Sequence, residues 1–384
     1  MDPSERIAWL ALAAVHGVGP ATFGRLVAAF GGARSVLHAA SDGRLGRAAI
    51  KVETGRRLPT EVVDRILVAA AAPDAATATL ERFGLWTLTP LDPAYPSRFG
   101  VLEAAPPVLY GWGDPAALED HYAVGVVGTR RPTPAGRALA ARVARHVAGR
   151  GAVVISGLAI GIDGAAHAAT VEAEGRTVAV IGAGHDHPGP RAHRALLRRI
   201  LARGGAVVSE LAPHAPASRG TFPRRNRLLS ALADAVVVVE APSRSGAINT
   251  GHHALEQGRA LFVAPGRPGD PATAGCLRLL RETPARPFVG LAELDEDLAA
   301  LGIGPVRAGD RPVAAPDPLV DLGAAERSVA VAIARAPSGL ERLVAATGLP
   351  PGVVGGAVTL LQLRGLARIV DGAVLPAGPL LERG

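Results

Sequence analysis

The middle of the chain alternates short apolar runs with longer segments of helical periodicity. Each run is rich in valine and isoleucine and is too short for a helix, which is typical of strands buried on both faces of a sheet. The runs are YAVGVV (122–127), AVVIS (152–156), TVAVI (177–181), AVVSE (206–210), AVVVVE (235–240) and ALFVA (260–264). Helical segments of roughly ten to sixteen residues separate most of them, which predicts βαβ units and a parallel sheet.

A helical region precedes this alternation. Apolar residues follow helical spacing from Ile7 to Ala14, and the sequence HGVGP (16–20) separates that helix from a second one at 21–30. This order resembles a helix-hairpin-helix or SAM-like module. Such a turn can present backbone N–H groups to DNA phosphates, and a plain turn between two helices is the alternative.

The C-terminal part of the chain predicts a further folded unit. Helical patterns lie at 325–335, 340–348 and 353–365. Two apolar runs that flank Asp371-Gly372 follow them, and Asp-Gly in that setting is a strong hairpin signal. Three helices and a hairpin make a winged helix.

Together these patterns predict an α/β protein of four segments. They are a small helical SAM or helix-hairpin-helix-like domain (1–75), an extended Rossmann-like domain with a parallel sheet (76–302), a proline-rich linker (303–318) and a winged-helix-like domain (319–384). The apolar and aromatic residues of segment 84–121 predict an ordered extension that packs on the sheet domain.

Positive charge is concentrated in the sheet domain. The whole chain carries a net charge of +7, whereas residues 121–240 hold sixteen arginines and seven carboxylates, a net charge of +9. The rest of the chain is therefore slightly acidic. A basic excess confined to one domain indicates a polyanion as the partner, and a solvated basic surface is the alternative.

Other features of the sequence indicate the compartment. Cys276 is the only cysteine, which excludes an internal disulfide and is typical of a reducing environment. No charge-free apolar run reaches the ~18 residues of a membrane span. The apolar run at 7–15 follows Asp2 and Glu5 instead of a basic segment, so it does not have the pattern of a signal peptide. We therefore expect a cytoplasmic protein without membrane segments.

The turn after the first predicted strand argues against a dinucleotide enzyme. A Rossmann fingerprint needs G-x-G-x-x-G, because the backbone must approach a pyrophosphate closely. Here the turn begins Gly128-Thr129-Arg130, and Arg130 takes the place of the second glycine. An arginine at this place can instead bind a phosphate through two hydrogen bonds. We therefore expect no cofactor.

The second turn, SGLAIGIDGAAH (156–167), has two interpretations. Its glycines, with Gly157 directly after Ser156, leave backbone N–H groups able to face an anion. Ser156, Asp163 and His167 could also form the triad of a hydrolase. The G-x-S-x-G elbow is absent because position 154 is Val, so hydrogen bonds that cap the helix and brace the loop are the favoured interpretation.

A cluster of histidines raises the question of a metal. His185, Asp186, His187 and His193 lie close together in the sequence. Neither an H-E-x-x-H helix nor a set of cysteines accompanies them, so exposed loop histidines are the favoured interpretation and we expect no metal.

The strongest chemical signal is the stretch GTFPRRNR (220–227). Arg224, Arg225, Asn226 and Arg227 follow Phe222, which combines phosphate contacts with a surface for base stacking. A basic helix start exposed to water is the alternative, but positive charge at a helix N-terminus opposes the helix dipole. Another turn suited to an anion follows the fifth predicted strand and contains Ser245, Gly246 and Thr250.

These motifs, in this order, resemble the DprA or Smf family of DNA-processing proteins. The resemblance rests on VGTR (127–130), SGLAIGIDGAAH (156–167), TVAVIGAG (177–184), VVSE (207–210), FPRRNRLLSAL (222–232), VVVEAPSRSGAINT (237–250) and GRALFVAPG (258–266). It implies a non-catalytic protein that binds single-stranded DNA, protects incoming strands during natural transformation, loads the RecA recombinase onto them and forms homodimers.

The resemblance and the motifs together predict the residues that contact DNA. They are Gly128, Arg130, Ser156, Gly157, Phe222, Arg224, Arg225, Asn226, Arg227, Ser245, Gly246 and Thr250. Two other classes of function stay open at this point. One is a nucleotide-processing hydrolase with a Rossmann-like pocket, and the other is a scaffold that meets DNA only through a partner.

Overall fold

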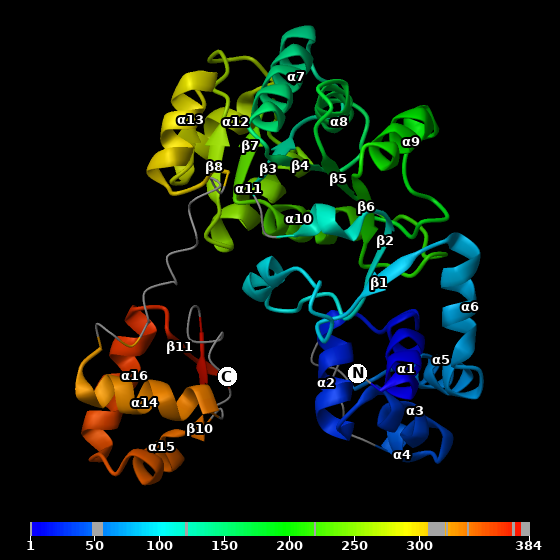
Figure 1. Cartoon of the computed structure of the whole chain (residues 1–384), viewed down its shortest axis with the longest axis vertical. Helices are drawn as coiled ribbons and strands as arrows, with labels where there is room; N and C mark the ends of the chain where they lie inside the picture. The colour runs from blue at the N-terminus through cyan, green and yellow to red at the C-terminus, as the bar shows by residue number, and fades with distance from the viewer. Residues whose placement is uncertain are drawn as a thin grey trace. The chain divides into compact units, whose positions relative to one another are not determined.

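The computed structural model of this chain describes residues 2–47, 57–119, 122–218, 220–305, 319, 322–335, 338–370 and 373–377. The chain divides into two compact units, Met1–Pro305 and Val306–Gly384. Figure 1 draws the first unit from blue to yellow and the second from orange to red.

The first unit is built on a sheet that has nine strands among the described residues. Its order is β1-β2-β6-β5-β4-β3-β7-β8-β9, and every pairing from β6 to β9 is parallel. The six runs predicted as strands form its centre, within two residues of the predicted limits. They are β3 (Ala123–Val127), β4 (Val153–Ser156), β5 (Thr177–Val180), β6 (Ala206–Ser209), β7 (Ala235–Val238) and β8 (Ala260–Val263).

Segment 84–121 packs on the sheet domain, as predicted, and does so by joining the sheet. It supplies β1 (Trp86–Leu88) and β2 (Leu109–Gly113), which pair antiparallel, and β2 also pairs antiparallel with β6. Gly111 is required there, because a Cβ at this position would lie 2.1 Å from the Trp86 ring. At the opposite edge lies the short β9 (Arg286–Pro287). Short 3₁₀ helices lie at Ser97–Val101, Pro115–Leu118 and Arg191–His193.

Helices cover both faces of this sheet, because successive strand residues point to opposite sides. Ile155 belongs to the core on one face and its neighbour Val154 to the core on the other. The first face is covered by α10 (Thr221–Leu232), α11 (Gly246–Glu256) and α12 (Ala274–Glu282). The second is covered by α7 (Pro134–Gly149), α8 (Ile162–Glu172), α9 (Arg194–Ala202) and α13 (Leu291–Ala300).

The N-terminal helices have a core of their own. They are α1 (Pro3–Ala13), α2 (Pro20–Phe30), α3 (Ala33–Ser41), α4 (Arg44–Arg47), α5 (Thr60–Ala71) and α6 (Asp74–Phe83). Leu12, Leu26 and Ile66 are fully buried within it. The two predicted helices and the turn between them are present, and Gly17 in that turn has a φ of +97°, which favours glycine. Helix α6 runs across the predicted boundary at residue 75, and the domain limits stay a prediction.

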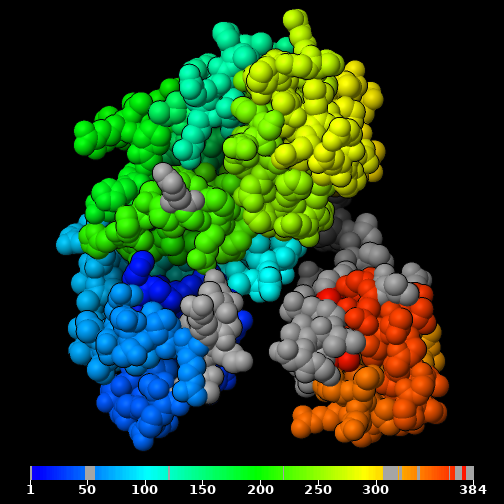
Figure 2. Space-filling view, turned by 180° about the vertical axis from the view of Figure 1, so that it is seen from behind, coloured from blue at the N-terminus to red at the C-terminus, as the bar shows by residue number. Residues whose placement is uncertain are grey.

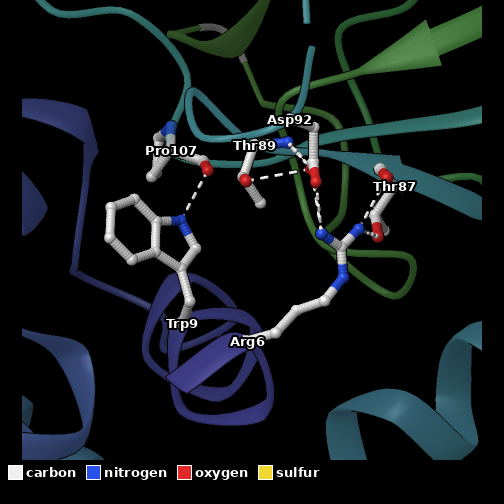
Figure 3. A network of polar contacts seen from close by, with 6 residues as sticks. All are labelled: Arg6, Trp9, Thr87, Thr89, Asp92 and Pro107. Carbon is white, nitrogen blue, oxygen red and sulfur yellow. Dashed lines mark hydrogen bonds and ion pairs between the residues drawn. The ribbon is translucent and has the colours of Figure 1, made fainter. Parts of the chain in front are cut away.

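Polar contacts fasten helix α1 to the sheet domain. Arg6 donates to the Asp92 carboxylate at 2.7 and 2.9 Å, and the Trp9 indole donates to the Pro107 carbonyl at 2.7 Å (Figure 3). Burial alone would raise the pKa of Asp92, but hydrogen bonds from Thr89 and Arg6 hold it below its ordinary value. Figure 2 shows the blue helices from behind, directly against the green part of the same unit.

The second unit contains three helices and a small sheet among its described residues. The helices are α14 (Ala324–Arg335), α15 (Leu340–Thr347) and α16 (Pro351–Leu363), and the strands are β10 (Ser338–Gly339), β11 (Ala367–Val370) and β12 (Ala373–Pro376). Strands β11 and β12 pair antiparallel, whereas the Asp371-Gly372 turn and the linker residues 306–318 lie outside the described residues. The assignment as a winged helix stays a prediction.

No single helix in the described ranges is long and apolar enough to cross a membrane. Helices α15 and α16 meet that requirement only as a pair bent by 110°, and both contribute buried side chains to the core of the second unit.

Candidate nucleic-acid interface

The predicted loops meet at the carboxyl ends of β3 and β7. The chain progresses from β3 toward β6 on one side and from β7 toward β9 on the other, so the strand order reverses between these two neighbours. Ligands of open α/β sheets bind at such a point. The loop after β3 is fixed there, because Thr129 donates its N–H to the Glu240 carbonyl at 2.7 Å and accepts from the Ile162 N–H at 3.2 Å.

Two unusual backbone positions bring the second loop against the first. Gly161 has a φ of +100°, and a Cβ there would lie 2.4 Å from the Thr129 carbonyl oxygen. Leu158, which is not a glycine, has a φ of +58° and a buried side chain. Strained residues of this kind persist where the surrounding structure imposes them, and they gather at functional sites. The loops are therefore held close together by packing.

A carboxylate of the protein occupies the N-terminus of α7. Glu240 is buried and accepts from the Thr133 N–H at 3.0 Å and from its hydroxyl at 2.6 Å. A Cβ at Gly136 would lie 2.1 Å from the same carboxylate. In dinucleotide-binding folds the helix after the first strand binds the pyrophosphate at this end. The sequence predicts no dinucleotide here. The Glu240 carboxylate is a second reason for that prediction, because it lies at the helix N-terminus where a pyrophosphate would bind.

Arg130 and Phe222 are brought together across 92 positions of sequence. Arg130 is exposed at the end of the β3 loop, and its guanidinium carbon lies 4.9 Å from the centre of the Phe222 ring. Phe222 is half-buried in the first turn of α10 and not in a loop. Gly182, after β5, allows this position, because a Cβ there would lie 3.0 Å from the ring. An exposed cation and a half-buried aromatic ring therefore lie together at the carboxyl edge.

Arg225 does not lie on the surface, unlike the phosphate contact expected from the sequence. Its side chain is buried, and its guanidinium donates to the Gly157 carbonyl at 2.8 Å and to the Val180 carbonyl. A Cβ at Gly157 would lie within 2.6 Å of both the Arg225 guanidinium and the Asp163 carboxylate. Burial raises the pKa of Asp163, and the Arg225 charge opposes that rise. Arg225 therefore joins the ends of β4 and β5 to α10.

The other predicted residues differ in their exposure. Arg224 is exposed, whereas Arg227 is half-buried, donates to the Ala104 carbonyl at 3.1 Å and forms an ion pair with Glu210. Asn226 is buried and donates to the Gly246 carbonyl at 3.2 Å, which joins α10 to the start of α11. Ser245 caps α11 by accepting from the Ala247 N–H, Thr250 is buried in that helix, and Gly128 is half-buried beside Glu240.

The three residues of the conceivable hydrolase triad have other partners. Ser156 is buried and donates to the Val126 carbonyl at 2.7 Å, and His167 Nδ1 lies 2.7 Å from the Thr177 hydroxyl. Asp163, in the first turn of α8, accepts from the Ala159 N–H, and a hydrogen bond from the Ser156 side chain also opposes the rise that burial gives its pKa. Within the described part of the chain, His167 Nε2 has no hydrogen-bond partner. These bonds are the capping and bracing contacts that the sequence favours over a triad.

The histidine cluster does not consist of exposed residues alone, which corrects the sequence-based interpretation. His185 is buried, its ring packs edge-on against Trp112, and Nε2 lies 3.0 Å from the Val207 carbonyl. His193 is half-buried and bonds to the Leu158 carbonyl, and His187 is exposed. No group of three potential ligands among the described residues is placed to hold a metal ion.

The two buried histidines predict a loss of stability in mild acid. Burial lowers the pKa of His167 to about 3 and of His185 to about 4, below the ~6.5 of an unfolded chain. The unfolded state therefore binds more protons as the pH falls below that value. From pH 6.5 to 5.5, each histidine should lower the free energy of unfolding by about 1 kcal/mol, measured by urea titration. His185→Gln should remove about half of this loss, whereas His187→Gln should leave it unchanged.

Comparison with known families identifies most of the chain. The family model described as DNA recombination-mediator protein A matches residues 86–299, and that of a DprA-like N-terminal HHH domain matches residues 3–61. A putative DNA processing protein DprA of Mycobacterium tuberculosis is 40% identical over 280 residues, which are 71% of this chain and 70% of the relative. The DNA processing protein DprA of Bacillus subtilis is 36% identical over 52% of this chain and 67% of its own length.

Two solved structures are also similar. DNA processing protein A of Streptococcus pneumoniae superposes with a TM-score of 0.62 and 28% identity, over 77% of this chain and 96% of that one. The protein of the same name from Helicobacter pylori, whose structure describes a single-stranded DNA binding mode, superposes with a TM-score of 0.51 and 29% identity. That match covers 56% of this chain and 96% of that one.

Proposed function

We propose, because this chain belongs to the DNA recombination-mediator protein A family, also called DprA or Smf, that it binds single-stranded DNA at the carboxyl edge of its sheet. The observation that carries the proposal is the contact of the exposed Arg130 with the half-buried ring of Phe222. The net charge of +9 in residues 121–240 supports it, because phosphate contacts dominate the affinity for DNA.

Binding replaces one contact of Phe222 with another. In the free protein the Arg130 guanidinium lies over the ring, and an exposed cation–π pair contributes about 0.5–1 kcal/mol. A base stacked on an aromatic side chain contributes about 1–3 kcal/mol, so the base displaces the guanidinium. Arg130 then turns to a phosphate, where its planar fork makes two charge-assisted hydrogen bonds. Neither contact depends on which base is present, so binding is independent of sequence.

The wider role that we propose follows from membership of the family. The protein covers incoming single strands during natural transformation, delivers them to the RecA recombinase and acts as a homodimer in the cytoplasm. It performs no catalysis. The partners of Ser156 and His167 outside the triad support this proposal against a nucleotide-processing hydrolase, and so does the Glu240 carboxylate at the N-terminus of α7.

Three assays with the whole chain test this function. Fluorescence anisotropy should show direct binding of oligo(dT), which a scaffold that meets DNA only through a partner would not give. Chromatography of nucleoside triphosphates incubated with the protein should show no new product, whereas a hydrolase would give one. The RecA step is tested by whether the protein lets RecA form filaments on a strand already covered by a single-strand-binding protein.

The C-terminal unit is expected to make no tight contact with duplex DNA. A DNA-reading third helix carries basic or amide residues, whereas α16 and the residue after it offer only Gln362 and Arg364 among apolar and small side chains. Arg364 also lies 3.8 Å from Glu326 of α14. A fragment of residues 319–384 should show no sub-micromolar binding to duplex DNA at physiological salt in an anisotropy titration. Tight binding there would assign the unit to duplex recognition.

A further inference from the structure

A cleft of about 1110 Å³ lies beside the Arg130–Phe222 pair, between the N-terminal helices and the sheet domain. One wall consists of the turn at 16–20 with parts of α1, α5 and α6, and the other consists of residues 210–216 with Tyr110. Gly182, Thr221 and Arg224 line the end of the cleft, next to Phe222. The cleft is therefore continuous with the proposed DNA site.

The polar groups of the cleft match a polyanion that carries flat, partly apolar bases. Most of the lining is apolar, including Val68, which is 72% exposed. Glu210 is the one carboxylate among the described lining residues, and it is paired with Arg227. Two exposed arginines, Arg65 and Arg224, are also part of the lining, and Arg65 donates to the His16 carbonyl of the turn at 3.1 Å. Single-strand binding grooves combine positive charge with surfaces on which bases stack, and this cleft offers two exposed arginines and an apolar wall.

Tyr110 gives the cleft a polar group that is left without a partner. Its side chain is 2% exposed, and within the described residues its hydroxyl makes no hydrogen bond. A buried hydroxyl without a partner destabilises a fold unless something else satisfies it. Tyr110 packs in a cluster of buried residues with Leu10 and Leu80, so a nucleobase reaches this hydroxyl only when the wall of the cleft moves.

We propose that the cleft binds the continuation of the same single strand, with bases against its apolar wall and phosphates at Arg65 and Arg224. This inference rests on the proposed function, since the strand enters from Phe222. It extends that function by giving the N-terminal helices a direct part in DNA binding. If the cleft instead bound a protein segment or a free nucleotide, that result would overturn the proposal.

Two substitutions on one helix test the cleft. Ala75 and Ala78 are both exposed on α6, but only Ala75 lines the cleft. Ala75→Glu places a carboxylate in the path of the phosphates and should weaken binding of an oligonucleotide of about 16 residues roughly tenfold. Binding of one of about four residues, which fits on Phe222 and Arg130 alone, should not change. Ala78→Glu makes the same change of charge outside the cleft and should alter neither affinity.

Removal of the Tyr110 hydroxyl gives a second test, in which the stability of the free protein should rise while its affinity for DNA falls. Tyr110→Phe removes an unsatisfied group, so the free protein should unfold at a higher temperature. The same substitution should weaken binding of the longer oligonucleotide about fivefold, because the base loses a hydrogen bond. A hydroxyl with a purely structural role would leave the DNA affinity unchanged, and that result would overturn its part in the site.

The failures of the two proposals can be told apart. If Phe222→Ala and Arg130→Ala weaken both oligonucleotides but Ala75→Glu weakens neither, the strand does not enter the cleft. If Phe222→Ala and Arg130→Ala have no effect, the carboxyl-edge site itself is wrong. Crosslinking with a 5-iodouracil oligonucleotide should label peptides within 10–22 or 107–112, and labels confined to the region of Phe222 would overturn the inference.

Discussion

Phe222→Ala is expected to weaken binding of oligo(dT) by about 1–3 kcal/mol, the contribution of one stacked base. Duplex DNA, whose base faces are hidden, should be affected much less. The side chain is half-buried on the first turn of α10 and touches little of the core, so the fold should tolerate the change. Anisotropy titrations with single-stranded and duplex oligonucleotides measure the difference, and Phe222→Trp should retain the affinity.

Arg130→Ala should change the salt dependence of DNA binding, unlike Phe222→Ala at the neighbouring side chain. Loss of one phosphate contact should reduce the slope of log K against log salt by about 0.7, whereas Phe222→Ala should leave that slope unchanged. Arg281→Ala is the control, because Arg281 is exposed on α12 and pairs with Glu282. Equal losses on single strands and duplexes for Phe222→Ala would mean that the ring only supports the fold.

Arg225→Met is expected to lower the free energy of unfolding by about 3–5 kcal/mol, the cost of leaving a buried charge without its partner. The substitution removes the bonds to the Gly157 and Val180 carbonyls and leaves Asp163 with its burial uncompensated. Arg224→Ala, at the neighbouring exposed position, should change stability by less than about 0.5 kcal/mol. Urea titration at constant pH compares the two variants directly.

A second substitution shows how much of the lost stability comes from the unpaired charge of Asp163 and how much from the lost packing of Arg225. Asp163→Asn in the Arg225→Met background should recover part of the lost stability, because no unpaired charge then remains inside the domain. If Arg225→Met instead kept its stability and reduced the salt slope of DNA binding, Arg225 would be the surface phosphate contact that the sequence suggests.

The strands were predictable because their apolar runs are continuous, and both faces of a parallel sheet are buried. Strands β1, β2 and β9 were not, since Leu109–Gly113 contains two glycines and a tryptophan and β9 is two residues long. The pairing of β2 with β6 joins residues about one hundred positions apart. No local pattern contains that information.

The site was predictable in its residues and less so in their roles. Arg130 and Phe222 were both expected to bind DNA, but their direct contact depends on Gly182, which comes from a third segment. Arg225 follows Arg224 in the same basic stretch. Arg225 is buried because its guanidinium bonds to the Gly157 and Val180 carbonyls, whereas Arg224 is exposed. Whether a polar side chain is buried depends on hydrogen-bond partners that lie far away in the sequence, and the local sequence does not identify those partners.

Glu240 has a consequence for which ligands can bind at this edge of the sheet. The end of α7 that holds a phosphate group in dinucleotide enzymes is occupied here by the carboxylate of Glu240. A nucleotide that entered would have to expel a buried carboxylate with three hydrogen bonds. If the protein binds DNA at this edge as proposed, that binding should therefore not change with the concentration of free dinucleotides.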